Sequence, residues 1–307
     1  MKKRTLMALG LVAVLGASMF AGCGSSDDSA ETAESAEEET TEETDESSAS
    51  IPSGDITVIS REDGSGTRGA FVELTGVEED DVDNTTASAE ITNSTAVMMT
   101  TVAGNENAIG YISLGSLDDS VTALTIDGVD ATLENVKNGT YAISRPFNIV
   151  YYEDSADEVT ADFIAYIMSA DGQAVIEEEG YVSVEEGEAY EASGLSGSIQ
   201  IGGSSSVTPV MEKLAESYEA LNDGVSIEVI QSDSTTGVQT AYEGTVAIGM
   251  ASRELKDEEL EYGLTSLTIA MDGIAVIVNN NNGIGELTMD QIKSIYVGEI
   301  TTWEELQ

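Results

Sequence analysis

Short runs of β-branched residues alternate with amphipathic stretches along the chain from Asp55 onwards. Runs whose apolar residues alternate predict strands, and apolar residues three and four positions apart predict helices. The predicted strands are 56–59, 198–201, 225–230 and 274–278, and the predicted helices are 160–168, 173–179, 207–221, one through Phe71 and Leu74, and one that Thr288 caps. Regular alternation of strand and helix predicts an α/β fold with largely parallel sheets.

The first 22 residues have a different pattern. Residues 2–4 are all Lys or Arg, an apolar run covers 6–20, and two small residues precede Cys23. The run is too short to span a membrane comfortably, and the order of charged, apolar and small residues is typical of a signal peptide. The Cys after Ala-Gly resembles the bacterial lipobox, which implies cleavage after residue 22 and lipidation of Cys23. The alternative is an ordinary secretory signal with an incidental cysteine.

Residues 23–54 predict an acidic tether. After Cys23 the segment is dominated by Ser, Thr, Ala, Glu and Asp and contains no Lys or Arg. Like charges extend such a segment, and few of its side chains can pack into a core. We therefore expect a spacer between a lipid anchor and the folded part, on the outer face of the cell membrane.

Composition excludes several classes of function. The 307 residues include 11 Lys+Arg and 58 Asp+Glu, and the net charge of −47 becomes −50 when residues 2–4 are removed. Such a chain repels nucleic acid and other copies of itself, which favours a monomer. It has no histidine, which excludes Ser-His-Asp and Cys-His catalysis and most transition-metal chemistry. Its single cysteine excludes an intramolecular disulfide. We expect neither an enzyme nor a cofactor or metal.

Three segments place small hydroxyl residues and glycines at predicted strand-to-helix turns. They are 61–68, 203–209 and 232–237. The N-terminus of a helix offers unpaired N–H groups and the positive end of a dipole, and small residues let a tetrahedral oxyanion approach. Each segment alone is explained by ordinary helix capping. Three that face one cleft predict an anion site that needs no metal.

Arginines accompany these turns. Arg61, Arg68 and Arg253 lie in or near them, and Arg61 stands two residues before Asp63. This spacing predicts an arginine that its own carboxylate holds and that forks toward an anion; a plain surface ion pair is the alternative. Gly64, Ser65 and Gly66 do not form a nucleophile elbow, because no histidine is available as a base. The turns also lack the Gly-Lys-Ser/Thr ending of a nucleotide-binding loop.

Taken together, these segments resemble the phosphate-binding proteins of bacterial phosphate ABC transporters. The matching stretches are 58–71, 107–111, 144–146, 180–182, 203–209, 247–253 and 271–278, and the resemblance covers nearly all of 55–307. It implies a two-lobed periplasmic-binding-protein-like fold (type II), with the ligand in a cleft between the lobes. It also implies an extracytoplasmic protein that binds inorganic phosphate and delivers it to the permease subunits of an ABC importer.

The order of the segments differs from that of the family. The family's second half matches about 55–190 and comes first here, whereas its first half matches about 197–307. We expect a circular permutation with 183–197 as the linker between the old termini; a truncated tandem fusion is the alternative. The resemblance then implies a split lobe (55–145 with 271–307) and a continuous lobe (146–270).

Carrying the family's contacts over residue by residue implies a set of phosphate-binding positions. They are Arg61, Ser65, Gly66, Thr67, Ser205, Ser206, Ser234 and Ser252, with Asp63 and Arg253 in support. The family often has an aspartate where Ser252 stands, and that carboxylate rejects sulfate by accepting a proton from phosphate. Ser252 leaves open another oxyanion, such as sulfate, molybdate or a phosphonate. A surface phosphate-binding lipoprotein that works without a permease is a further alternative.

Overall fold

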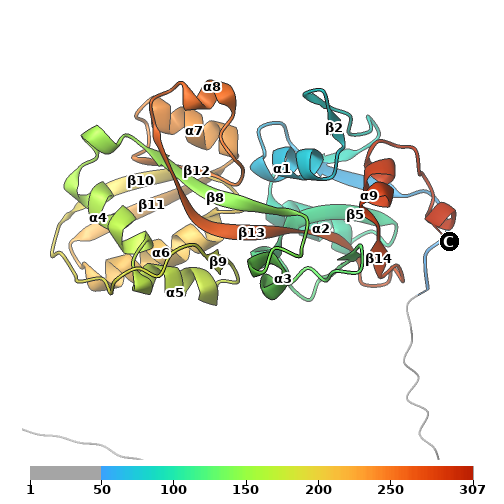
Figure 1. Cartoon of the computed structure of the whole chain (residues 1–307), viewed down its shortest axis with the longest axis horizontal. Coiled ribbons are helices and arrows are strands. Elements are labelled where there is room, and N and C mark those ends of the chain that lie inside the picture. Colours follow the sequence, from blue (N-terminus) through green and yellow to red (C-terminus); the bar gives the residue numbers. More distant parts are fainter. Residues whose placement is uncertain (1–49, 307) are drawn as a thin grey trace, which may run out of the picture. The chain divides into compact units, whose positions relative to one another are not determined.

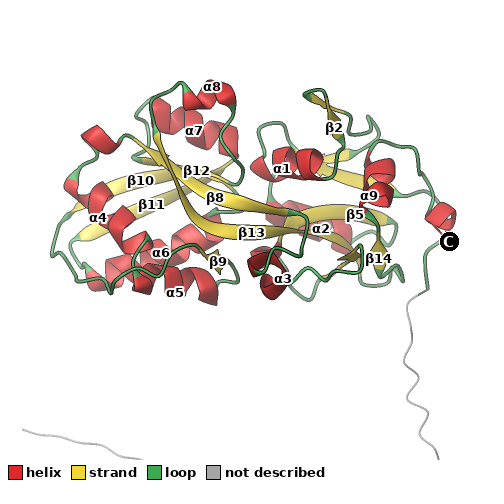
Figure 2. Ribbon diagram, viewed as in Figure 1, coloured by secondary structure: helices red, strands yellow, loops and turns green. Residues whose placement is uncertain are grey.

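The computed structural model describes residues 50–306 (Figure 1). The predicted signal peptide, Cys23 and all but the last residues of the predicted tether therefore lie outside the described residues. Over the range that the structure covers, no helix combines the length and the apolar character that a membrane span requires. The prediction of an α/β fold is confirmed (Figure 2).

One long sheet organises the described chain. Its order is β11 (Val225–Ser232), β10 (Gly197–Ser204), β12 (Ile248–Ala251), β8 (Ser144–Tyr151), β13 (Thr265–Asn279), β5 (Ala108–Ser113), β1 (Thr57–Arg61) and β4 (Glu90–Thr92). β6 (Val121–Ala123) and β9 (Val182–Ser183) also pair with β13. Two further pairs, β2 (Glu78–Glu79) with β3 (Val82–Asp83) and β14 (Glu286–Leu287) with β7 (Thr125–Ile126), stand apart from it.

The sheet is less parallel than the sequence predicts. The outer pairs, in which β10 joins β11 and β12 and β1 joins β4 and β5, are parallel, as expected. The centre is antiparallel, because β8 runs opposite to both β12 and β13, and β13 runs opposite to β5. The prediction of largely parallel sheets is therefore wrong for the middle of the molecule.

Helices cover the strands. They are α1 (Gly66–Leu74), α2 (Thr95–Ala103), α3 (Leu133–Lys137), α4 (Glu158–Ile167), α5 (Ala170–Glu178), α6 (Thr208–Leu221), α7 (Ser234–Tyr242), α8 (Asp257–Leu260) and α9 (Met289–Tyr296). The predicted cap of α9 is confirmed: the Thr288 side chain accepts from the Gln291 N–H while the Gln291 side chain accepts from the Thr288 N–H. This reciprocal arrangement satisfies two N–H groups that a helix start leaves unpaired.

The apolar residues form separate cores at the two ends of the sheet. Phe71, Tyr296 and Trp303 belong to one core, and Phe163 and Met211 to the other. We call the part around the first core lobe I and the part around the second lobe II. β8 and β13 run side by side from one part to the other (Figure 1). β13 contributes to both cores, with Ile269 and Ala270 in lobe II and Ile274, Val276 and Val278 in lobe I.

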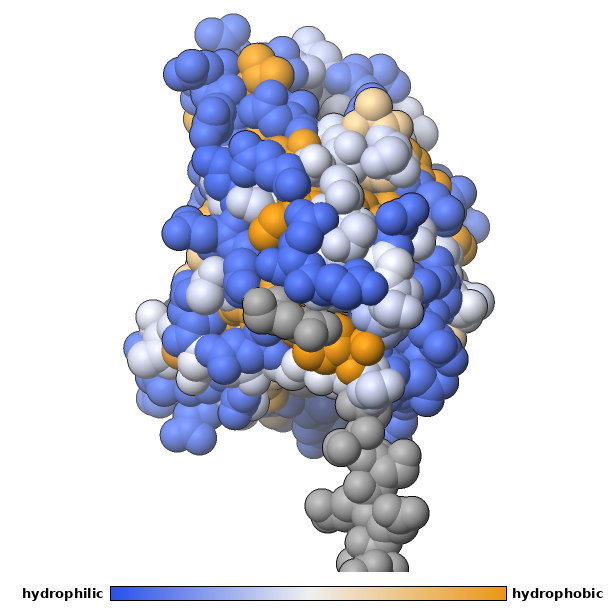
Figure 3. Space-filling view, turned by 90° about the vertical axis from the view of Figure 1, so that its right-hand side faces the viewer, coloured by the Kyte–Doolittle hydropathy of each residue, from blue (hydrophilic) through white to orange (hydrophobic). Residues whose placement is uncertain are grey.

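Lobe I holds the two ends of the described chain together. The Ile56 N–H donates to the Thr301 carbonyl at 2.8 Å, and the Trp303 N–H donates to the Gly54 carbonyl at 3.2 Å. Asp55 and Thr302 form an isolated antiparallel bridge between them. Figure 3 shows that the face at this end of the molecule is mostly hydrophilic, with scattered hydrophobic residues.

The segment between β9 and β10 is fastened to lobe II. The Asp162 carboxylate on α4 accepts hydrogen bonds from the hydroxyls of Tyr190 and Tyr218, each 2.6 Å long, and from Ser193 at 2.8 Å. The Asn222 side chain donates to the Tyr190 hydroxyl at 3.1 Å. Residues of this segment therefore have fixed partners on α4 and α6.

Candidate functional site

The N-termini of three helices meet where lobe I faces lobe II. α1 belongs to lobe I and begins after Ser65, whose Oγ accepts from the Arg68 N–H at 3.3 Å. α6 and α7 belong to lobe II, and α7 begins after Asp233, whose carboxylate accepts from the Thr236 N–H. Helix starts of this kind concentrate N–H donors and positive dipole ends in one place.

Polar side chains from the two lobes contact one another there. Thr67 Oγ1 lies 2.8 Å from Ser206 Oγ, and the Arg61 guanidinium donates a 3.0 Å hydrogen bond to Ser205 Oγ. These four residues are all buried. The structure thus brings together residues from the first and second predicted turns, which are more than 130 positions apart in the sequence.

The third turn joins the same cluster through backbone and hydroxyl contacts. The Thr235 N–H on α7 donates to the Gly64 carbonyl of lobe I at 3.2 Å. Ser234 Oγ accepts from the Ser252 N–H at 3.0 Å and lies 3.4 Å from Ser252 Oγ. Ser204 Oγ donates to Ser252 Oγ at 2.8 Å. We call the buried set Thr67, Ser204, Ser205, Ser206, Ser234 and Ser252 the hydroxyl cluster.

Gly66 is at a close approach between the lobes. A Cβ atom added to Gly66 would collide with the Oγ atoms of both Ser234 and Ser252. Only a residue without a side chain lets the first turn of α1 reach the hydroxyl cluster at this distance. The backbone of α1 therefore faces the hydroxyls of lobe II directly.

Arg61 pairs with a different carboxylate from the one that the sequence predicts. Its Nε and Nη2 atoms donate to the two oxygens of Glu62, each at 2.8 Å, and only 2% of its surface is exposed. Asp63 is fully exposed and pairs with Arg68 at 3.1 Å. The prediction that Asp63 holds Arg61 is therefore wrong, because Glu62 takes both of these hydrogen bonds while the Asp63 side chain lies in solvent beside Arg68.

The other two arginines support the site from outside the hydroxyl cluster. Arg68 donates to the Arg61 carbonyl at 2.8 Å and to Asp83 at 2.7 Å. Arg253 makes two hydrogen bonds to Glu259 and one, at 3.1 Å, to Thr235 Oγ1. Burial alone would raise the pKa of Glu259, but the hydrogen bonds from Arg253 and the Lys256 N–H lower the pKa below its usual value. Arg253 thus connects Glu259 to Thr235, in the first turn of α7.

Several residues of the site were not predicted from the sequence. Thr95, at the start of α2, lies 3.4 Å from Ser206 Oγ through its hydroxyl. Glu62 holds Arg61, and Ser204 completes the hydroxyl cluster. Ser94 caps α2 and stands before an apolar stretch, which is the signal that would have pointed to Thr95.

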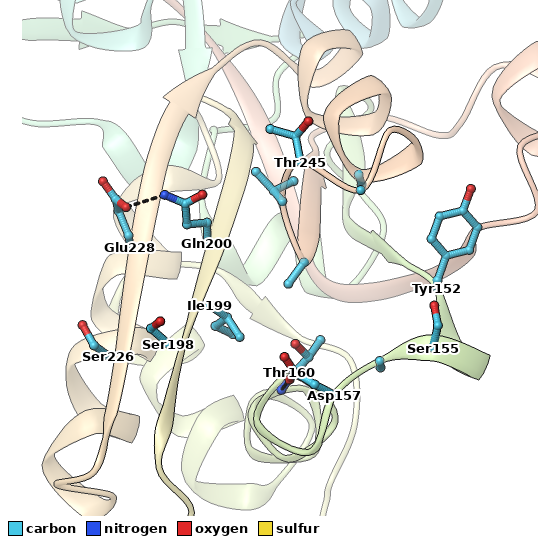
Figure 4. Close-up of a pocket in the computed structure, with 15 residues that line it drawn as sticks. Tyr152, Ser155, Asp157, Thr160, Ser198, Ile199, Gln200, Ser226, Glu228 and Thr245 are labelled. Carbon is cyan, nitrogen blue, oxygen red and sulfur yellow. Dashed lines mark hydrogen bonds between the residues drawn. The ribbon is translucent and has the colours of Figure 1, made fainter.

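Two of the cavities in the described part of the chain bear on where the site lies. A cavity of about 270 Å³ borders the site and is lined by Thr95, Ala96, Met99, Ser205 and Pro209 among others. A larger one, of about 540 Å³, lies within lobe II beside Gln200 and Glu228 (Figure 4). None of the predicted site residues lines the larger cavity, so its size does not make it the binding site.

The comparisons with known proteins agree with this architecture. A family model for the PBP superfamily domain matches residues 38–171 and 188–307. The phosphate-binding protein PstS 2 of Streptococcus agalactiae serotype V is 47% identical over 312 residues, which cover 100% of this chain and 99% of the relative. The crystal structure of a phosphate-binding protein of a phosphate ABC transporter from Streptococcus pneumoniae TIGR4 is 45% identical, with a TM-score of 0.68. It covers 83% of this chain and 100% of that one.

Another relative matches a smaller part. The phosphate-binding protein PstS of Pseudomonas aeruginosa is 32% identical over 134 residues, which span 39% of this chain and 42% of the relative. The full-length match and the family model identify the family, and they confirm the resemblance noted in the sequence. The chain belongs to the PBP superfamily and, within it, to the PstS phosphate-binding proteins.

Proposed function

We propose that the protein binds inorganic phosphate between lobe I and lobe II and delivers it to the permease subunits of an ABC importer. The observation that carries this proposal is the contact of Arg61 and Thr67 with Ser205 and Ser206 across the two lobes. The relatives with full-length or near full-length matches are named phosphate-binding proteins. The proposed binding residues are Arg61, Ser65, Gly66, Thr67, Ser205, Ser206, Ser234 and Ser252, to which the structure leads us to add Thr95.

The chemistry of these groups suits a tetrahedral oxyanion. Helix N–H groups and hydroxyls donate hydrogen bonds without needing a counter-charge, and the Arg61 guanidinium adds one buried positive charge. Hydroxyls also accept hydrogen bonds, so they can accept one from the P–OH group of hydrogen phosphate. Such local donors are needed because the chain as a whole, at −47, repels anions.

Calorimetry on the chain without residues 1–22 and with Cys23→Ser tests the proposal directly. We expect saturable heat on titration with inorganic phosphate and a melting temperature that rises with phosphate concentration, because a ligand of the native state stabilises it. No heat and no shift at millimolar phosphate would contradict the proposal.

A second candidate ligand class follows from the surroundings of Ser252. The Ser252 Oγ contacts the hydroxyls of Ser204 and Ser234. An aspartate in place of Ser252 would discriminate against fully ionised anions. A hydroxyl can donate to sulfate as well as accept from hydrogen phosphate, so sulfate, molybdate or a phosphonate are candidates for the same site. Competition calorimetry separates the two cases, and tighter sulfate than phosphate binding would favour this second one.

We also infer that the chain is a circular permutation of the family's usual order. Residues 54–56 lie against 301–303, and this adjacency supports a direct connection between the two segments in the usual order. Permutation at such adjacent surface positions is physically tolerable. The S. agalactiae relative matches along its whole length, whereas the P. aeruginosa relative matches about two fifths of its length in one run. The proposed lobes are 55–145 with 271–307 and 146–270, with 183–197 as the linker.

Restoring the usual order tests the permutation. A gene that places 197–307 before 55–182 should produce a folded protein that binds phosphate with unchanged affinity. A truncated tandem fusion, in which 55–190 and 197–307 come from different repeats, predicts instead that the reordered chain fails to form one two-lobed unit.

We propose a lipid anchor on Cys23 that holds a monomer on the extracytoplasmic face of the cell membrane. The sequence pattern of residues 1–23 supports this, and the relatives belong to a transporter family that works outside the cytoplasm. Metabolic labelling with palmitate should mark the unaltered chain and leave a Cys23→Ser variant unlabelled. Phosphate uptake that is unchanged when the gene is deleted would favour a surface protein that works without a permease.

A further inference from the structure

Two oppositely charged residues lie fully buried where the two longest central strands pass between the lobes. Arg145 on β8 and Asp272 on β13 face each other in the antiparallel register, and each has 1% of its surface exposed. Arg145 Nε and Nη2 donate to Asp272 Oδ2 at 3.1 and 3.0 Å. This ion pair is therefore a fixed part of the strands that connect lobe I to lobe II.

The pair also reaches into both lobes. Ser113, at the end of β5 in lobe I, donates to Asp272 Oδ1 at 2.9 Å. Arg145 Nη1 donates to the backbone carbonyl of Ser252 in lobe II at 3.1 Å. Ser252 in turn carries the Oγ that contacts Ser204 and Ser234. A continuous chain of hydrogen bonds thus runs from β5 through the ion pair to the hydroxyl cluster.

Stability alone does not account for such a pair. Removing two charges from water costs about as much as, or more than, their attraction returns, and replacing a buried ion pair by apolar residues of similar volume is often neutral or stabilising. What an apolar pair cannot do is hold the Ser252 carbonyl in one direction. The planar fork of Arg145 does so, because it bonds Asp272 through one edge while Nη1 reaches Ser252.

We propose that Arg145 and Asp272 are positioning residues for the oxyanion site. By fixing the Ser252 carbonyl, they set the place of Ser252 Oγ and Ser234 Oγ opposite Gly66, where the lobes approach each other closely. Since both residues sit on the connecting strands, they tie the geometry of the hydroxyl cluster to that of the strands. This inference rests on the proposed phosphate binding.

The double variant Arg145→Met/Asp272→Leu separates positioning from stability. It removes both charges together and keeps side-chain volume, so we expect it to melt near the temperature of the unaltered protein. Its dissociation constant for inorganic phosphate, measured by calorimetry well below the melting temperature, should rise by about tenfold or more, as loss of a hydrogen bond to a charged group implies. Binding equal to that of the unaltered protein would overturn the inference.

A matched control uses an ion pair outside the site. Lys213→Met/Glu216→Leu removes the exposed pair on α6, whose Nζ–Oε2 distance is 3.0 Å, and should leave phosphate binding unchanged. If the double variant at 145 and 272 does not fold, Arg145→Lys replaces it. Lysine keeps the charge but lacks the planar fork that directs separate donors to Asp272 and Ser252, so weaker binding by a folded protein supports the inference and unchanged binding overturns it. An unaltered protein that binds no phosphate would overturn the proposed function, and this inference with it.

Discussion

Arg61 Nη2 lies 3.0 Å from Ser205 Oγ, although 144 positions separate the two residues in the sequence. Arg61 ends β1 in lobe I, and Ser205 follows β10 in lobe II. Because the same Nη2 also bonds Glu62, the guanidinium is held from its own lobe while it reaches the other one. The contact defines where an anion would have to bind both lobes at once.

Gly66→Ala should weaken phosphate binding by at least about tenfold without unfolding the protein. Alanine is more favourable in a helix than glycine by about 1 kcal/mol, so the substitution should not destabilise α1 itself. The added methyl group would meet Ser234 and Ser252 and keep the lobes apart. Calorimetry and thermal melting together check this. Gly285→Ala is the control, because a Cβ atom at Gly285 has no neighbour within 4 Å; equal effects of the two variants would contradict the prediction.

Glu62→Gln should weaken phosphate binding by about tenfold, and Asp63→Asn by less than about twofold. Glu62 accepts two hydrogen bonds from Arg61, and a glutamine would turn an N–H₂ group toward one of them. Asp63 bonds Arg68 on the exposed surface, where an ion pair contributes little. The ratio of the two dissociation constants is the measurement. A larger effect at Asp63 would contradict this expectation and would indicate that Asp63 holds Arg61 when phosphate is bound.

Thr95→Val should lower the affinity for phosphate by about threefold, within the range for one neutral hydrogen bond. The substitution removes the hydroxyl that lies 3.4 Å from Ser206 Oγ and keeps the shape of the side chain. Thr100→Val on the same helix is the control, since the Thr100 hydroxyl donates to the Ala96 carbonyl at an exposed position. Thr95 is not a ligand if both variants bind like the unaltered protein.

Asp162→Asn should destabilise the protein on the order of 2 kcal/mol at neutral pH, because the carboxylate accepts three hydrogen bonds. Burial tends to raise the pKa of Asp162, but the hydrogen bonds from Tyr190, Tyr218 and Ser193 lower it below the usual value. A lowered pKa means that the stabilisation is present above about pH 4 and is lost as pH falls through the folded-state pKa.

Urea unfolding of the Asp162→Asn variant and the unaltered protein at several pH values measures this difference. The gap in unfolding free energy should close as the pH falls below 4. Proteolysis should also cut the Asn variant faster within 184–196, since the bonds from that segment to α4 lose their charged acceptor and weaken. A gap that is independent of pH would mean that the charge of Asp162 is not what fastens the segment.

The sequence predicts the outer parts of this fold better than its centre. Alternating apolar residues identify β10 and β11, and the Thr288 capping box identifies α9, because these signals are local. β13 has 15 residues, of which only the buried run 274–278 was predicted as a strand. Its first part belongs to lobe II and alternates less clearly, so its continuation through both lobes is a tertiary property. α2 was missed because its threonines and valines are poor helix formers.

At the site, too, the sequence predicts the local features but not the contacts between distant residues. The three turns could be found because each combines glycine, hydroxyl residues and a helix start within a few positions. The partner of Arg61 could not, because Glu62 and Asp63 both lie within two positions of it and only the folded structure shows which side chain turns toward it. Arg145 and Asp272 were read only as family resemblance, since nothing local marks a pair 127 positions apart as being in contact.

The place where the described chain begins decides which lobe a membrane anchor would hold. Ser50 bonds Gly283, and Gly54 bonds Trp303, so the chain enters the folded part at lobe I. In the usual order of the family the folded part would begin near residue 197, in lobe II. If Cys23 carries the anchor and the halves are permuted, as proposed above, the anchor would hold the protein through lobe I instead. Lobe II would then be the half without a direct connection to the anchor, and an importer would meet the two lobes in the reverse of the order that an unpermuted lipoprotein presents.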